Sequence, residues 1–278
     1  MWMTDKVRIG LANSNPAYGI FPRGQMNSTI LKDVWKLGIR KVDSAEDYIF
    51  ANQILRESKL DWKIQTKFKI PESHNDFDSL FNRINSLVAK SKVESLLIHN
   101  SDFYLHKHAN RIIDDLKIIT SEVGISSLGI SIYRPRELEG LNSWNKLDVI
   151  QFPHNPLDTN CLTWLMKNLK ENTPKLQTRS IYLQGLLISE GSNLTNLPWE
   201  LAQVILNWQN WVLDNNLSAQ EYCARFAINE TRIEEIIVGV DSSKQLEDLL
   251  KFEVNKEKMP MFEEAVSEKA SDPRSWFH

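Results

Sequence analysis

The chain has 278 residues, and its 42% of hydrophobic residues are enough to build one full-sized core. Its formal net charge of -3, without any basic run, argues against nucleic acid and anionic membranes as partners. No stretch approaches the roughly 18 apolar residues of a membrane-spanning helix, and the first residues lack the apolar segment of a signal peptide, so we expect a cytoplasmic location. Cys161 and Cys223 lie far apart in the sequence, which predicts free thiols without a disulfide framework or a metal site.

Short runs that are typical of β-strands alternate with helical patterns along the chain. The eight strand-like runs are residues 7–12, 40–45, 62–69, 95–100, 127–133, 148–154, 176–183 and 234–240. Between them lie amphipathic segments whose apolar residues recur at a spacing of three and four. Eight such units predict a single-domain α/β fold, a (β/α)8 TIM barrel over residues 1–278. A doubly wound open sheet is the alternative, but no GxGxxG motif follows the first run.

Two segments depart from the regular alternation. A Ser/Asn-rich stretch and a long helical pattern follow the seventh run, so residues from about 184 to 230 are expected to form an elaborated seventh βα connection. Residues 259–278 follow the last helical pattern and are expected to form a C-terminal tail. No linker or low-complexity segment between them indicates a second domain.

Four polar residues lie at or just after the ends of three successive strand-like runs: Asp43, Tyr48, Lys67 and His99. In a (β/α)8 barrel the carboxyl ends of the strands face one pocket, so we expect these side chains to converge. Asp43 supplies a counter-charge for Lys67, and the Lys67 cation is expected to lower the pKa of Tyr48. His99 is suited to orienting a substrate oxygen. Each residue alone is more often structural, but their convergence indicates a proton-donating catalytic site.

The chain resembles the aldo-keto reductases over nearly its whole length. The resemblance is carried by the strings GIRKVDSAEDY, KIQTKF, LLIHN, LGISIY, VIQFPHN and RSIYLQGLL, which occur in family order. In that family an acid, a tyrosine, a lysine and a histidine serve hydride transfer from a nicotinamide to a carbonyl. The resemblance implies that Tyr48 is the proton donor, that Lys67 and Asp43 tune it, and that His99 orients the carbonyl group.

The resemblance also implies a nicotinamide dinucleotide cofactor and residues that bind it: Ser131, Gln151, Ser180, Asp241, Ser242, Gln245 and Asp248. The first two match contacts to the nicotinamide carboxamide, Ser180 lies near the pyrophosphate, and the others match the adenosine end. Asp241 stands where many relatives have a basic residue for the 2′-phosphate. A carboxylate there favours NADH, whereas family precedent favours NADPH, so the cofactor is expected to be NADPH or NADH. Alternatively, Asp241 is a solvated helix N-cap residue.

Polar residues in the loops after the strands indicate a polar, sugar-like aldehyde or ketone, or the matching alcohol, as the small-molecule substrate. They are Asn13, Ser14, Asn15, Arg134, Arg136, His154 and Asn155. The strings RSIYLQGLL and VGVDSSKQL resemble family members associated with bacterial sugar or polysaccharide biosynthesis. Two other functions stay open: a Schiff-base lyase with Lys67 as nucleophile, and a catalytically silent nucleotide-binding or regulatory protein on a reductase scaffold. A monomer or a weak homo-oligomer is expected.

Overall fold

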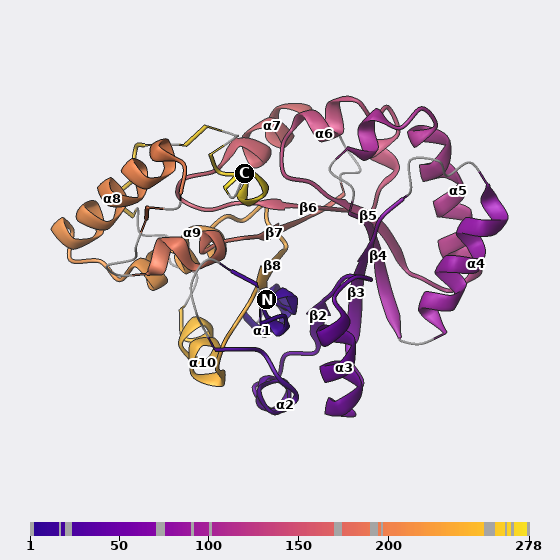
Figure 1. Ribbon diagram of the computed structural model, residues 1–278, viewed down its shortest axis with the longest axis horizontal. Coiled ribbons are helices and arrows are strands. Elements are labelled where there is room, and N and C mark those ends of the chain that lie inside the picture. Colours follow the sequence, from indigo (N-terminus) through magenta and orange to yellow (C-terminus); the bar gives the residue numbers. More distant parts are fainter. Residues whose placement is uncertain are drawn as a thin grey trace.

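The computed structural model describes residues 3–16, 18–19, 24–70, 76–89, 92–99, 102–169, 174–189, 194–195, 197–252, 259–264, 266–267 and 270–276. At its centre, eight parallel strands form a closed barrel in the order β1 to β8, in which β8 pairs with β1 (Figure 1). The strands are β1 (Val7–Gly10), β2 (Lys41–Asp43), β3 (Lys63–Phe68), β4 (Val93–Ile98), β5 (Ser127–Ser131), β6 (Val149–Pro153), β7 (Lys175–Arg179) and β8 (Glu235–Val238). The predicted single-domain (β/α)8 barrel is confirmed.

Helices connect the strands and lie outside the barrel (Figure 1). They are α1 (Met3–Lys6), α2 (Ser28–Lys36), α3 (Ile49–Ser58), α4 (Phe77–Val88), α5 (Ala109–Glu122), α6 (Arg136–Glu139), α7 (Asn160–Asn168), α8 (Trp199–Asp214), α9 (Ala219–Ile228) and α10 (Ser243–Leu250). Short 3₁₀ helices are η1 (Ala12–Ser14), η2 (Phe103–Leu105), η3 (Trp144–Lys146), η4 (Leu183–Ile188) and η5 (Pro273–Ser275). Within the described ranges, none of these helices combines the length and the apolar character that crossing a membrane requires.

Local sequence signals set where several elements begin and end. Asn27 caps α2, because its side chain accepts hydrogen bonds from two backbone N–H groups of the first turn, each at 3.0 Å. Ser180 ends β7 because its φ of 58° lies in the left-handed region, which an extended strand cannot continue through. The strand predicted over residues 176–183 therefore stops early, at Arg179, and the chain turns into η4.

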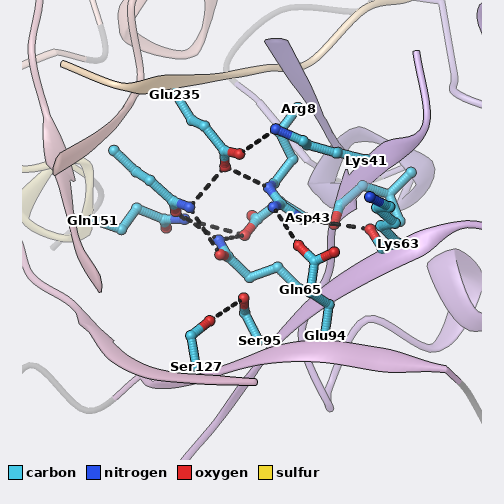
Figure 2. A network of polar contacts seen from close by, with 12 residues as sticks. Arg8, Lys41, Asp43, Lys63, Gln65, Glu94, Ser95, Ser127, Gln151 and Glu235 are labelled. Carbon is cyan, nitrogen blue, oxygen red and sulfur yellow. Dashed lines mark hydrogen bonds and ion pairs between the residues drawn. The ribbon is translucent and has the colours of Figure 1, made fainter. Parts of the chain in front are cut away.

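The interior of the barrel is polar, whereas barrel interiors are usually filled by layers of branched apolar side chains. Gln65 of β3 and Gln177 of β7 come from opposite sides of the barrel and hydrogen-bond to each other across its centre. Nearby, Arg8 of β1 pairs with Glu235 of β8 at 3.0 Å. Figure 2 shows Arg8, Glu235, Gln65 and Asp43 in one network of polar contacts. The apolar core lies instead where the strands pack against the surrounding helices.

A second apolar cluster lies beside the barrel, in the connection from β7 to β8. This connection holds η4, α8 and α9, and it covers the segment from about residue 184 to 230 that was expected to be elaborated. Trp208 is fully buried in the cluster, next to Tyr222 at a ring-centroid distance of 5.5 Å. Trp276, from the expected tail at residues 259–278, packs into the same cluster. Parts of the connection and of the tail lie outside the described residues.

Candidate active site

Side chains from three successive βα units meet in one cavity at the carboxyl end of the barrel. Asp43 ends β2, Lys67 lies in β3, His99 directly follows β4, and Tyr48 directly precedes α3. All four line the cavity. The structure therefore brings together the four residues that the sequence indicated as catalytic, as expected for strand ends that face a common rim.

Lys67 and Asp43 form a buried ion pair on the floor of this cavity. Lys67 Nζ donates to Asp43 Oδ2, and both side chains are almost fully buried. Asp43 Oδ1 accepts two further hydrogen bonds, from Gln65 Nε2 at 2.8 Å and from Gln151 Nε2 at 3.1 Å. Burial alone would raise the pKa of Asp43, but the Lys67 ammonium and these hydrogen bonds hold it below its usual value. Burial lowers the pKa of Lys67, and the Asp43 carboxylate opposes this effect.

Tyr48 lies against both Lys67 and His99. Lys67 Nζ is 5.8 Å from the centroid of the Tyr48 ring, and the Tyr48 and His99 rings meet edge to face at a centroid distance of 6.4 Å. Burial raises the pKa of Tyr48 above its usual range, and the Asp43 carboxylate raises it further. This direction is opposite to the predicted lowering by Lys67. The main reason is that burial disfavours the charged phenolate, and the Asp43 carboxylate, which is paired with Lys67, adds to this effect.

His99 is a neutral imidazole near pH 7. Burial lowers the pKa of His99 to about 4, and the nearby cations of Lys67 and Arg179 add to this effect. A neutral histidine and a protonated tyrosine thus stand together in the cavity. Such a pair can donate hydrogen bonds to one oxygen atom without bringing a net charge to it.

The two residues predicted to bind a nicotinamide carboxamide are buried and bond to other side chains of the protein. Ser131 and Gln151 are both buried, and Ser131 Oγ donates to Gln151 Oε1 at 2.9 Å. The amide nitrogen of Gln151 is bonded to Asp43, and Ser131 Oγ also accepts a hydrogen bond from Arg179 Nε at 3.4 Å. Neither Ser131 nor Gln151 is among the described residues that line the cavity, whereas Ser180 is.

The other end of the cavity reaches the N-terminus of α10. Asp241 and Gln245 line it there. Ser242 is the N-cap residue of α10 and accepts from the backbone N–H of Gln245 at 3.3 Å, so the interpretation of Asp241 as the N-cap is wrong. Asp241 instead accepts a hydrogen bond from Asn13 Nδ2 at 3.0 Å. Asp248, another predicted adenosine contact, is not among the described residues that line the cavity.

Asp248 of α10 pairs with two lysines. Its Oδ1 accepts from Lys244 Nζ at 2.5 Å and from Lys251 Nζ at 2.9 Å. These contacts lower the pKa of Asp248 and occupy the ammonium group of Lys244. Lys244 is therefore engaged by a carboxylate in this structure, in the first turn of the helix and two residues after the N-cap.

A family profile described as the aldo/keto reductase family matches residues 6–267. The chain belongs to this family. The aldo/keto reductases are oxidoreductases, and the match spans the barrel and all four residues of the candidate catalytic group. A search of curated proteins finds no match to the sequence.

Solved structures of aldo-keto reductases share the fold of this family member at low sequence identity. One from Bacillus halodurans, in its holo form, has 15% identity and a TM-score of 0.63, with 88% of this chain and 85% of that chain covered. One from a Medee basin deep-sea metagenome library has 14% identity and a TM-score of 0.59, with 91% and 86% covered. One from Brucella melitensis has 17% identity and a TM-score of 0.58, with 90% and 89% covered.

Two residues of this aldo/keto reductase that the sequence reading passed over also line the cavity, Tyr133 and Arg179. Arg179 is the last residue of β7, directly before Ser180, and its guanidinium lies over the Tyr133 ring at 3.9 Å. The two-residue alternation of a strand places Arg179 on the same inner face as Gln177. That alternation was visible in the sequence and indicates an inward-pointing arginine at the barrel rim.

The loop residues expected to form a polar mouth contribute less than predicted. Of the seven, Asn13 and Asn15 line the cavity, and the other five are not among its described lining residues. His154 and Asn155 are buried, and the His154 ring stacks on Phe226 at a centroid distance of 4.9 Å. Other polar side chains take their place in the wall: Gln25, Gln184 and Gln220.

Proposed function

We propose that this aldo/keto reductase reduces the carbonyl group of a small polar aldehyde or ketone, or oxidises the matching alcohol, with a nicotinamide dinucleotide. The observation that carries the proposal is the meeting of a protonated Tyr48 and a neutral His99 above the Lys67–Asp43 pair in one cavity. An uncharged acid beside an uncharged donor suits an oxygen that gains negative charge during the reaction.

The residues present fit such a cofactor by their donor set and by the extent of the cavity. One end of the cavity holds the catalytic group, and the other end reaches Asp241 and Gln245 at the capped N-terminus of α10. A helix N-terminus suits the phosphates of a dinucleotide, because the helix dipole and the first backbone N–H groups favour negative charge there. When bound, the nicotinamide supplies the hydride. Ser180 and the α10 end are the parts of this chain that would hold the cofactor.

The side chains then have separate roles. Tyr48 holds the proton that the carbonyl oxygen receives, and its burial keeps that proton on the phenol until the oxygen becomes basic. His99 donates a hydrogen bond that orients the same oxygen. The Lys67–Asp43 pair fixes the floor beneath the Tyr48 ring, and the surrounding burial keeps bulk water away from the acid.

The preferred cofactor in this proposal is NADH. Asp241 lines the cavity at the adenosine end, where its carboxylate repels a 2′-phosphate and accepts a hydrogen bond from a ribose hydroxyl. Lys244, the nearby cation that would attract the phosphate, is bonded to Asp248. The polar wall formed by Asn13 and Asn15 supports a polar, sugar-like substrate.

The two alternative functions have less support. A Schiff-base lyase needs a lysine amine that is free to attack a carbonyl, whereas Lys67 is almost fully buried and its Nζ is engaged by Asp43. A silent nucleotide-binding protein needs no neutral acid in its cavity, yet Tyr48 and His99 are both held uncharged. Borohydride trapping of a substrate adduct on Lys67 would favour the lyase.

The test combines binding with turnover. Fluorescence titration with NADH and NADPH measures cofactor binding, and absorbance at the dihydronicotinamide band follows the oxidation of the cofactor by a panel of polar aldehydes. Tyr48→Phe should keep cofactor binding and lower kcat by about 10²–10⁴-fold, the usual loss for a general acid. Tyr104→Phe removes a phenol that the described cavity does not include and is the matched control. Near-normal turnover in Tyr48→Phe would contradict the proposal.

A further inference from the structure

Arg179 is held in a fixed place at the rim of the barrel. Its guanidinium lies 3.9 Å from the centroid of the Tyr133 ring, and the guanidinium of Arg274 lies 3.8 Å from the same centroid. Two cations that close to one ring must lie on its opposite faces, because a single face has no room for both. The Tyr133 ring therefore lies between the two guanidinium groups, and Arg179 is the one that lines the cavity.

The two arginines on either side of Tyr133 differ in their carboxylate partners. Arg274 pairs with Asp272 at 2.5 Å and with Glu137 at 3.5 Å. Arg179, by contrast, has no carboxylate within ion-pair distance among the described residues, and Asp43 is already taken by Lys67. Among the described residues that line the cavity, Arg179 is thus a cation without a carboxylate partner. Such a cation attracts an anion from solution.

Arg179 has hydrogen-bond donors on both terminal nitrogens that are available to a ligand. Its three hydrogen bonds to described residues use one N–H on each nitrogen: Nε to Ser131 Oγ at 3.4 Å, Nη1 to Ser180 Oγ at 3.2 Å, and Nη2 to the Ile132 carbonyl at 2.9 Å. A guanidinium has five N–H groups, so one on Nη1 and one on Nη2 have no acceptor among the described residues. Two such donors on adjacent terminal nitrogens match the two oxygens of a carboxylate.

We infer that Arg179 binds the carboxylate of an anionic substrate, an aldehyde or ketone that carries a carboxylate group close to the reacting carbonyl. This inference rests on the proposed function, because it places the carbonyl at Tyr48 and His99 in the same cavity. Arg179 is close enough to that end for its charge to act on both residues. An oxo acid, a semialdehyde or a sugar acid has the required chemistry.

Two aldehydes of equal chain length test the inference. Succinic semialdehyde carries a carboxylate where butanal has a methyl group. In the wild-type protein, kcat/KM should favour succinic semialdehyde by about 10- to 100-fold, as a charge-assisted bidentate contact allows. Arg179→Gln should abolish most of this ratio, and Arg179→Lys, which keeps the charge but not the pair of donors, should retain part of it. Arg136→Gln removes an exposed arginine outside the described cavity lining and should leave the ratio unchanged.

Cofactor titration separates this inference from a role in cofactor binding. If Arg179 binds the substrate, NADH affinity should be the same in Arg179→Gln and in the wild type. A substrate ratio that persists in Arg179→Gln would overturn the inference, as would a loss of NADH affinity in place of a loss of the ratio.

Binding of succinate separates the inference from the proposed function. Succinate has the carboxylate but no carbonyl to reduce, so calorimetric titration with and without NADH needs no turnover. Weaker succinate binding to Arg179→Gln than to Arg136→Gln would support the anion site even if no aldehyde is reduced. Equal binding to the two variants would overturn the site, even if reductase activity is found.

Discussion

Gln65 and Gln177 face each other across the centre of the barrel and exchange two amide hydrogen bonds. Gln65 Nε2 donates to Gln177 Oε1 at 2.8 Å, and Gln177 Nε2 donates to Gln65 Oε1 at 3.0 Å. The second hydrogen of each amide goes to a carboxylate, Asp43 for Gln65 and Glu235 for Gln177. The two amides therefore link Asp43 to the Arg8–Glu235 ion pair deeper in the barrel. Figure 2 labels Gln65, Asp43, Arg8 and Glu235 in this network.

Gln65→Met should remove a hydrogen bond that stabilises the charged form of Asp43. The folded pKa of Asp43 lies below its usual value, so Asp43 contributes stability above its unfolded pKa, and that contribution disappears as the pH falls through the folded pKa. Losing the Gln65 donor raises the folded pKa and should reduce the free energy of unfolding at pH 7 by about 1–3 kcal/mol. Urea unfolding should show that the deficit persists down to about pH 4, the usual carboxyl pKa, and shrinks below it as the pH falls through the folded pKa of Asp43. The exposed Gln53→Met is the control, and a deficit independent of pH would contradict the coupling.

Lys67→Met should leave a buried carboxylate without its cation. The expected loss is about 3–5 kcal/mol in the free energy of unfolding at pH 7, as for other broken buried ion pairs. Unpaired Asp43 then has a raised pKa, so the loss should diminish as the pH is lowered. The double variant Lys67→Met/Asp43→Asn removes the unpaired charge and should recover much of the stability in urea unfolding. No recovery in the double variant would show that packing of the lysine stem, not charge pairing, causes the loss.

The pH profile of carbonyl reduction should be flat across the neutral range. Burial raises the pKa of Tyr48 above its usual value of about 10, so the phenol keeps its proton throughout this range. His99, with its pKa lowered to about 4, stays neutral down to that pH. Single-turnover rates with saturating cofactor should therefore show no alkaline fall below about pH 10, the usual phenol pKa. A fall near pH 8 would restore the sequence-based expectation of a lowered Tyr48 pKa.

Asp241→Asn should shift the cofactor preference toward NADPH. Removing the carboxylate relieves its repulsion of a 2′-phosphate and should raise NADPH affinity relative to NADH by about 10-fold, within the range of charge-assisted contacts. Fluorescence titration with both cofactors measures the ratio. Glu247→Gln neutralises an exposed acid on α10 that does not line the described cavity, and it is the matched control. A ratio that is equal in the two variants would place Asp241 away from the 2′-position.

The sequence was enough to place Asp43, Lys67 and His99 at the barrel rim, because the carboxyl ends of the strands lie at one rim regardless of the contacts that the side chains make. It did not give the direction of the Tyr48 pKa, which depends on burial and on the fact that Asp43 engages the nearby cation. It also did not show that Ser131 and Gln151 bond to each other. Such pairings are decided by three-dimensional neighbours, which a single strand pattern does not contain.

The cavity wall at Tyr133 could not be predicted from neighbouring residues in the sequence, for the same reason. Tyr133 follows β5, whereas Arg274 comes from the end of the described chain, and their contact depends on the Asp272 pair that holds Arg274. Arg179 was accessible in principle, because the alternation of β7 already turns it inward.

The polar barrel interior also bears on how the strands find their partners. A slip of β3 by one residue would turn Gln65 and Lys67 outward and Thr66 inward, since alternate side chains of a strand face opposite sides. Asp43 would then lose its cation and an amide donor, and Gln177 would lose its partner across the barrel. An apolar interior tolerates such an exchange far better than a set of matched donors and acceptors. The polar side chains beneath the candidate site therefore also penalise misaligned barrels during folding.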